Sequence, residues 1–238
     1  MPVASAPGRR RRGRLATRAI VAAALLAGGA LAGELPPPAR WAPLTFPKVE
    51  RRTHYAAATV DGRAAVRADS DCAASALVVA TPDVDLARTP HLTWAWKVER
   101  GLLVADERGK AGDDFAARVW VMFQFDPARA SAWQRLRHAI ASRLHGRELP
   151  GAAISYVWSS REPIGASWED PFGAGSQRRV LRSGPPDGWQ RESVDVAADY
   201  RALVGGAPPP LLGVALMSDT DNTCQQAVAL FADFAWSP

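Results

Sequence analysis

The residues best suited to chemistry in this chain are aspartates in two short segments, Asp113-Asp114 and Asp219-Thr220-Asp221-Asn222. Alternating carboxylate and amide oxygens on a short loop suit a hard cation, because calcium takes six to eight oxygen ligands. The second segment lacks the glycine and distal glutamate of an EF-hand loop, which excludes that motif. The competing interpretation is an Asx turn, in which these side chains hydrogen-bond the backbone. Asp219 and Asp221 are therefore weak candidates for calcium ligands, and no other cofactor is predicted.

Paired carboxylates also catalyse glycosidic hydrolysis, one as the acid and the other as the base or nucleophile. Asp113 or Asp114 would act with Asp219 or Asp221, and Glu192 is a further candidate acid. The mechanism depends on the distance between the two carboxyl groups, which a sequence does not give. Because aspartates are common in turns, an enzyme acting on envelope polysaccharide is the alternative and not the leading hypothesis.

Arg118 lies four residues after Asp114, so the two side chains share a face if both belong to one strand. A charged pair buried there would either line a cleft or form a structural ion pair. The structural interpretation is favoured for the pair.

Tryptophans bear on sugar binding, because pyranose faces stack on exposed aromatic rings. Trp120 alternates with Val119 and Val121, so it leaves their apolar face and is available to a ligand. Trp158 and Trp168 flank a loop rich in Ser, Gly and Pro and are further candidates. For each of them ordinary packing is the alternative.

These residues belong to a series of short β segments separated by turn residues. The clearest is 92–98, where Leu92, Trp94, Trp96 and Val98 share one face and are predicted to be core. The predicted strands are 64–68, 75–80, 92–98, 118–125, 153–158, 179–182, 190–194, 211–217 and 227–236.

Two helices are predicted among the strands. The first spans 127–145, with Asp126 as N-cap, Trp133, Leu136, Ile140 and Leu144 on one stripe facing the core, and Gly146 as its end. The second spans 196–204, capped by Asp195 and closed by two glycines. Strands and helices do not alternate regularly, which argues against a parallel sheet. The predicted fold is all-β, a two-sheet antiparallel jelly-roll sandwich with one or two short helical insertions.

The first 32 residues resemble an export signal. An arginine cluster precedes an apolar stretch over 19–31, which ends in Ala30-Leu31-Ala32, a signal peptidase pattern. An uncleaved anchor is the alternative, although the stretch is short for a membrane span. The predicted organisation is a signal peptide (1–32), a proline-rich linker or extended lead-in (33–47) and a β-sandwich domain (48–238). The predicted location is periplasmic or secreted, with no membrane span after signal removal.

The net charge of +5 comes mostly from this segment. It holds six arginines and no acidic residue, which leaves 23 basic and 24 acidic residues in the remaining chain. Without a basic excess, a nucleic-acid partner is not expected. Cys72 and Cys224 are the only cysteines. In an oxidising compartment a bridge between them is expected, with two buried thiols as the alternative.

Several blocks, in order along residues 45–236, resemble the bacterial domain of unknown function 3047 family. They are 106–115 with 117–120, Ile154-Ser155-Tyr156-Val157-Trp158, Asp170-Pro171-Phe172, Gly188-Trp189, Asp199-Tyr200 and 218–223. One departure is Val194-Asp195, where the family is expected to have an Arg-Asn pair. The resemblance implies an exported bacterial protein with a fold similar to carbohydrate-binding β-sandwiches, and it implies no established activity.

The leading hypothesis is an exported module that binds a glycan or similar polar ligand. Its predicted site is Asp114, Arg118, Trp120, Trp158, Asp219, Asp221 and Asn222. The alternatives are the carboxylate-dependent enzyme and a structural or assembly component of the cell envelope.

Overall fold

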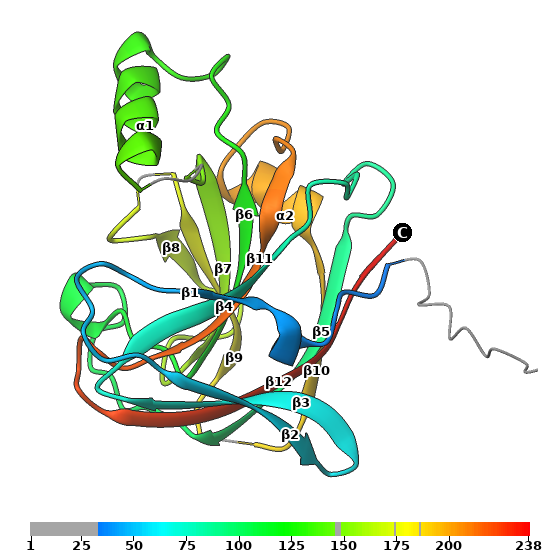
Figure 1. Ribbon diagram of the computed structural model, residues 1–238, viewed down its shortest axis with the longest axis vertical. Helices are drawn as coiled ribbons and strands as arrows, with labels where there is room; N and C mark the ends of the chain where they lie inside the picture. Colours follow the sequence, from blue (N-terminus) through cyan, green and yellow to red (C-terminus); the bar gives the residue numbers. More distant parts are fainter. Residues whose placement is uncertain (1–32, 146–148, 174, 186) are drawn as a thin grey trace, which may run out of the picture. The chain divides into compact units, whose positions relative to one another are not determined.

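The computed structural model describes residues 33–145, 149–173, 175–185 and 187–238, and the predicted export signal lies outside them. The domain consists of two β-sheets (Figure 1). The seven-stranded sheet has the order β1 (Ala42–Leu44), β4 (Ala74–Ala80), β11 (Leu211–Asp219), β6 (Ala117–Phe123), β7 (Ala152–Ser159), β9 (Gln177–Ser183) and β8 (Ser167–Glu169). The five-stranded sheet has the order β10 (Gln190–Asp195), β5 (His91–Arg100), β12 (Gln226–Ser237), β3 (Arg63–Asp71) and β2 (His54–Val60).

The predicted fold class is confirmed, and each of the nine predicted strands corresponds to an observed one. Three strands are additional to the prediction. β1 and β8 have three residues each, and β2 is rich in alanine and lacks a clear alternation of apolar and polar residues. One pairing differs from the antiparallel expectation, because β9 runs parallel to β7.

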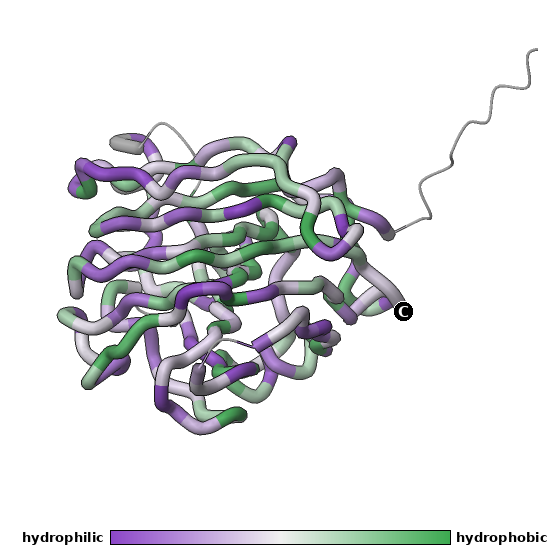
Figure 2. Tube along the Cα trace, turned by 90° about the horizontal axis from the view of Figure 1, so that it is seen from below, coloured by the Kyte–Doolittle hydropathy of each residue, from purple (hydrophilic) through white to green (hydrophobic). Residues whose placement is uncertain are grey.

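The main core lies between the two sheets and is built by alternation along the strands. Trp94 and Trp96 on β5 are fully buried, as predicted, with their ring centroids 5.4 Å apart. Figure 2 shows the strands side by side, with hydrophobic and hydrophilic residues mixed along their length. On β6, Val119, Val121 and Phe123 join this core, so Arg118 and Trp120 must point to the outer face of the seven-stranded sheet.

The proline-rich segment runs along the sandwich in an extended form. The backbone of Glu34 forms an isolated antiparallel β-bridge with Ala235. Trp41 is buried, and its Nε1 donates a hydrogen bond to the carbonyl of Pro36 at 2.8 Å. A short 3-10 helix, η1 (Pro38–Arg40), precedes β1, which pairs with β4. The segment therefore supplies a strand and core contacts.

The first helix differs from its prediction. α1 spans Ala132–His145 and begins later than expected, because Asp126 Oδ1 instead accepts the backbone N–H of Ala128 in a turn. Ser131 and Gln134 cap the helix by exchanging hydrogen bonds between side chain and backbone.

The predicted core stripe of α1 is also wrong for its first two members. Trp133 is 64% exposed and Leu136 is 51% exposed. The side chains of Ile140 and Leu144, and Gly146, lie outside the described residues. α1 projects beyond the end of the strands at the top of Figure 1, where the sandwich has no further layer to receive that stripe.

The second helix agrees with its prediction. α2 spans Val196–Leu203, and Asp195 caps it by accepting the N–H of Ala198. Asp199 accepts a 2.9 Å hydrogen bond from the hydroxyl of Tyr156 on β7 and pairs with Arg179, while Tyr200 packs on Phe123 with ring centroids 4.5 Å apart. Asp199 and Tyr200 therefore hold the helix on the seven-stranded sheet.

Cys72 and Cys224 form the expected disulfide. It joins the residue after β3 to the loop before β12, next to the end of the β3–β12 ladder. None of the helices among the described residues is long and apolar enough to cross a membrane.

Candidate functional site

Six of the seven predicted site residues come together at one end of the seven-stranded sheet. They come from the segment before β6, from β6 itself, and from the end of β11 with the loop that follows it. β6 and β11 are neighbours, with Arg118 opposite Met217. This one strand pairing brings together segments that lie about a hundred residues apart in the sequence. A second 3-10 helix, η2 (Lys110–Gly112), leads into the first of these segments.

Arg118 is the centre of this group and is 1% exposed. Its Nη2 donates to Asp219 Oδ2 and to the carbonyl of Asp113, both at 2.8 Å, and its Nη1 lies 3.4 Å from Asp113 Oδ2. The guanidinium lies over the ring of Phe115 at 4.7 Å and near that of Trp120 at 5.6 Å. The predicted ion pair of Arg118 with Asp114 is not formed, because Asp114 precedes β6 and binds the loop after β11; Arg118 pairs with Asp113 and Asp219.

A second buried arginine, Arg178 on β9, was missed by the sequence reasoning. Its Nε and Nη2 donate to the two oxygens of Asp113 at 3.0 and 2.7 Å, and its Nη1 donates to Asp170 Oδ2 at 2.6 Å. Two parallel N–H···O bonds of this kind are the strong, directional form of an arginine–carboxylate pair. Asp113 therefore bridges the two arginines. The only sequence signal was Asp170 in the block Asp170-Pro171-Phe172.

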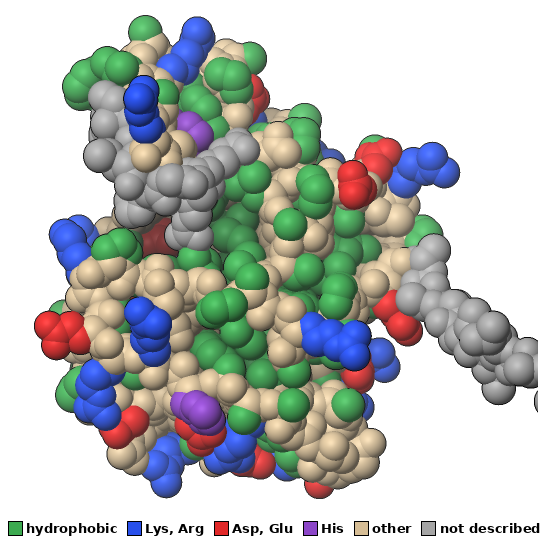
Figure 3. Space-filling model, in the orientation of Figure 1, with side chains coloured by type: hydrophobic (Ala, Val, Ile, Leu, Met, Phe, Trp, Pro, Cys, Tyr) green, Lys and Arg blue, Asp and Glu red, His purple; other side chains and the backbone are tan. Residues whose placement is uncertain are grey.

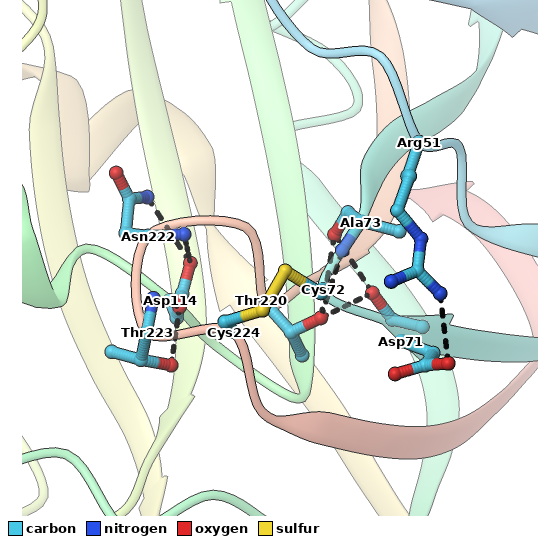
Figure 4. The surroundings of a disulfide bond; sticks show 10 residues. Arg51, Asp71, Cys72, Ala73, Asp114, Thr220, Asn222, Thr223 and Cys224 are labelled. Carbon is cyan, nitrogen blue, oxygen red and sulfur yellow. Dashed lines mark hydrogen bonds and ion pairs between the residues drawn. A yellow bond between two sulfur atoms is a disulfide. The ribbon is translucent and has the colours of Figure 1, made fainter.

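Asp114 holds the loop between β11 and β12. Its Oδ1 accepts hydrogen bonds from the backbone and side-chain nitrogens of Asn222 at 3.2 and 3.1 Å. Its Oδ2 accepts hydrogen bonds from the backbone nitrogen and the hydroxyl of Thr223, both at 2.6 Å. Figure 4 shows this carboxylate against the loop, which the disulfide ties on its other side. The hydrogen bonds differ from the Asx-turn interpretation, because the backbone nitrogens of Asn222 and Thr223 are bound by a carboxylate from outside the loop.

The same loop has a third attachment at Thr220. Its backbone nitrogen donates to the carbonyl of Ala73 at 2.9 Å, and its hydroxyl lies 3.0 Å from that of Ser70 (Figure 4 shows Thr220 beside Ala73). The loop is thus held by a carboxylate, a disulfide and a backbone pair. This fixes the positions of Asp219 and Asp221 on either side of Thr220.

Carboxylates outnumber cations in this region. The pKa values of two carboxyl groups, Asp219 and Asp221, are raised. Burial raises the pKa of Asp219 well above its usual range; Arg118 opposes this, and Asp114 and Asp113 add to it. Burial and then the Asp114 charge raise the pKa of Asp221. Burial lowers the pKa of Arg118, but Asp219 and then Asp113 outweigh it, so the net pKa is raised and the guanidinium stays charged.

These residues line a cavity of about 380 Å³, here called the charged cavity. Its aromatic walls are Phe46, Trp120 and Phe172, and Trp120 is half-buried as the prediction of an accessible ring requires. Its polar lining comprises Lys48, Asp113, Arg118, Asp170, Arg178, Asp219, Asp221 and Asn222. Asp114 lies behind this lining, with both oxygens taken by the loop.

Trp158 does not belong to this site. It is 5% exposed, points into the core between the sheets, and packs on Trp96 with ring centroids 5.9 Å apart. Its predicted role as a sugar platform is wrong. Trp158 lies two residues after Tyr156 on β7, and residues two apart on a strand share a face, so both side chains point inward. Trp168 packs against Phe115 beneath Arg108. Glu192, a candidate acid, is buried and accepts hydrogen bonds from Trp96 and Arg182 away from the cavity.

The candidate metal ligands lie close together, since Asp114, Asp219 and Asp221 each offer an oxygen within 4.8 Å of the others. Yet the oxygens of Asp114 accept four hydrogen bonds from the loop, and those of Asp219 accept from Arg118 and the N–H of Phe115. An arginine 2.8 Å from a carboxylate already neutralises the charge that would attract a cation. The same commitments leave Asp113, Asp114 and Asp219 poorly suited to serve as a catalytic base.

Two solved structures are similar to this chain at a low level. The family 30 carbohydrate-binding module of the cellulosomal cellulase Cel9D-Cel44B of Clostridium thermocellum has a TM-score of 0.41 and 12% identity, covering 85% of this chain and 92% of that one. The xyloglucanase domain of NopAA, a type three effector from Sinorhizobium fredii, in complex with cellobiose, has a TM-score of 0.33 and 8% identity, covering 85% and 99%. These values are too low to support an inference about ligand or activity.

No curated protein matches the chain. A family model does match, over residues 39–235, a range that contains both sheets apart from the last residues of β12 and every residue of the charged cavity. The chain therefore belongs to the family described as protein of unknown function (DUF3047).

Proposed function

We propose that this protein binds a glycan in the charged cavity, with a sugar ring against Trp120. The observation that carries the proposal is the combination of aromatic walls with fixed, buried charged groups in one cavity of about 380 Å³. Ligand sites of this size are typically apolar with a few precisely placed polar groups that orient the ligand. A sugar has both features, because its faces carry aligned C–H groups and its edge carries hydroxyls.

The rigidity of the lining supports binding over catalysis. Arg118 and Arg178 are held by Asp113, Asp170 and Asp219, so their geometry is set before a ligand arrives. Groups fixed in advance lose little conformational freedom on binding. A glycosidase needs one protonated and one ionised carboxyl free to meet the substrate. Only Asp221 combines a raised pKa with partial exposure in this lining.

A glycan array followed by calorimetry on the purified protein tests this proposal. We expect a ligand whose affinity falls about tenfold or more in Trp120→Ala, because the ring stacking is lost. Trp189→Ala is the matched control, since Trp189 is half-buried beneath Arg63 and packs on the outer face of the five-stranded sheet. A folded protein that binds no glycan, or one whose binding is equal in both variants, would contradict the proposal.

We infer in addition that the protein works outside the cytoplasm. The disulfide supports this, because such bonds persist in oxidising compartments. The predicted signal lies outside the described residues, so its test is independent of the fold. Mass spectrometry of the protein from the producing cells should show a mature chain that begins at Gly33. An intact residue 1 in that chain would favour the uncleaved anchor.

A further inference from the structure

A second cavity adjoins the charged cavity on the outer face of the seven-stranded sheet. It has a volume of about 490 Å³ and shares Phe46, Trp120 and Asp170 with its neighbour. We call it the apolar cavity. Because three lining residues are common to both, Trp120 stands at the junction of one continuous trough with two halves.

The two halves differ in chemistry. The apolar cavity is lined mainly by aliphatic and small side chains from β1, β4, β6, β7 and β11: Ala42, Leu44, Val78, Ala80, Met122, Ala153 and Leu212. Figure 3 shows hydrophobic side chains gathered across the middle of the face seen in Figure 1, around the paired strands β1 and β4, with charged side chains mainly at its edges. Val78 and Leu212 remain half-buried, so apolar surface in the trough still meets water.

A purely polar glycan accounts for only one half of this trough. Apolar surface gathered in a concave site marks a place where an apolar group binds, because its removal from water is favourable. An aliphatic chain beside Leu212, Val78 and Met122 would cover that surface. The ligand that fits both halves therefore carries a sugar and an aliphatic chain in the same molecule.

The charges of the other half indicate which head group fits. Both guanidiniums already have carboxylate partners, and carboxylates outnumber cations around the cavity. An anionic sugar would therefore find neither guanidinium free to pair with it. In addition, Nε of Arg118 is buried and has no hydrogen-bond acceptor among the described residues, although Arg118 lines the cavity. A sugar hydroxyl can supply that acceptor.

We propose that the ligand is an uncharged sugar carrying an aliphatic chain, with the sugar in the charged cavity and the chain in the apolar cavity. This inference rests on the proposed glycan binding and specifies its ligand class. Trp120 then contacts both parts, since its ring borders both halves of the trough. The order of the two halves follows from the sequence of β6. Arg118, Trp120 and Met122 are every second residue and therefore lie in a row on its outer face, from the charged cavity to the apolar cavity.

The test is calorimetry of the purified protein with maltose and with octyl, nonyl and decyl maltoside, each kept below its micelle concentration. We expect affinity to rise roughly threefold to fourfold with each methylene group that enters the apolar cavity. In Leu212→Thr this increment should shrink, whereas in Ile164→Thr it should stay, because Ile164 is exposed and lies outside the trough. An alkyl glucuronide should bind more weakly than the alkyl glucoside of the same chain length.

The outcomes separate this inference from the proposed function. Affinity for a sugar that is independent of chain length would overturn the amphiphile and leave glycan binding intact. Equal affinity for decanol and decyl maltoside would indicate a site for aliphatic chains alone and would overturn both.

Discussion

Asp114 illustrates how a carboxylate that resembles a catalytic group can instead be a structural one. Four hydrogen bonds from Asn222 and Thr223 use both of its oxygens, and the side chain is fully buried. The sequence places these residues more than a hundred positions apart, so only the pairing of β6 with β11 brings them together. Asp114 thus sets the position of the cavity wall without itself facing the ligand.

Replacing Asp114 tests this role. We expect Asp114→Ala to lower the free energy of unfolding by about 2–4 kcal/mol, because several buried donors of the loop lose their acceptor. Chemical denaturation measures the change. Asp170→Ala is a useful comparison, since Asp170 is less buried and accepts a hydrogen bond from Arg178 and one from the backbone of Phe172. A smaller loss for Asp114→Ala than for Asp170→Ala would contradict the assignment.

The raised pKa of Asp221 predicts a pH dependence with a definite sign. A carboxyl whose pKa is higher in the folded than in the unfolded state destabilises the fold when ionised. That penalty is absent below the unfolded pKa and develops as the pH rises through the folded value. Asp221→Asn should therefore stabilise the protein at pH 7.5, by less than about 1 kcal/mol because the group is partly exposed to solvent. The gain should disappear near pH 3, below the unfolded pKa, and thermal melts at the two pH values measure it.

The same reasoning applies to metal removal. Because the oxygens of Asp114 and Asp219 are already engaged by protein donors, we expect neither calcium nor a chelator to shift the melting temperature by more than about 1 °C. A stabilisation that grows with calcium concentration would follow from binding to the folded state. That result would restore the calcium site suggested by the spacing of Asp219 and Asp221.

At the scale of elements, alternation predicted the strands that have a strong apolar face and failed elsewhere. The pattern of β5 and β6 predicted their inner faces, including the outward placement of Trp120, and located their ends to within two residues. The alanines of β2 carry too little contrast between faces to be recognised. The parallel pairing of β9 with β7 has no local signature, so the position of Arg178 beside Asp113 could not be inferred.

In α1 the periodic pattern predicted burial that does not occur, because an apolar stripe on a helix need not face the core. Its two described apolar members are more exposed than buried. We therefore expect Trp133→Ala to change the free energy of unfolding by no more than about 0.5 kcal/mol. The control is Trp236→Ala, a buried residue of β12 that should cost about 3–5 kcal/mol. Equal costs in the two variants would show that α1 is covered in solution.

For the molecule as a whole, the disulfide is a long-range covalent connection and also part of the site. It closes a separation of 152 residues and tethers the loop that carries Asn222 and Thr223. A sequence with two cysteines predicts the bridge but does not reveal that it holds a cavity wall. Topology supplied that fact, since β3 and β12 are paired at this end.

The double variant Cys72→Ser, Cys224→Ser should lose about 5 kcal/mol of stability in the chain-entropy description. Wild-type protein unfolded under reducing conditions should show the same loss, which makes it the control. Denaturant titrations of the three samples give the values. If only the variant loses stability, the cause is packing damage by the serines and not the absence of the disulfide.

The order of the strands in the five-stranded sheet has a consequence for how the chain is made. β12 ends at Ser237, yet it lies in the middle of that sheet between β5 and β3. Until residues 226–237 have emerged from the ribosome, those two neighbours present unsatisfied backbone edges that invite pairing with other chains. A nascent polypeptide stalled before Gln226 should thus require a chaperone, because the five-stranded sheet can close only after β12 has been made.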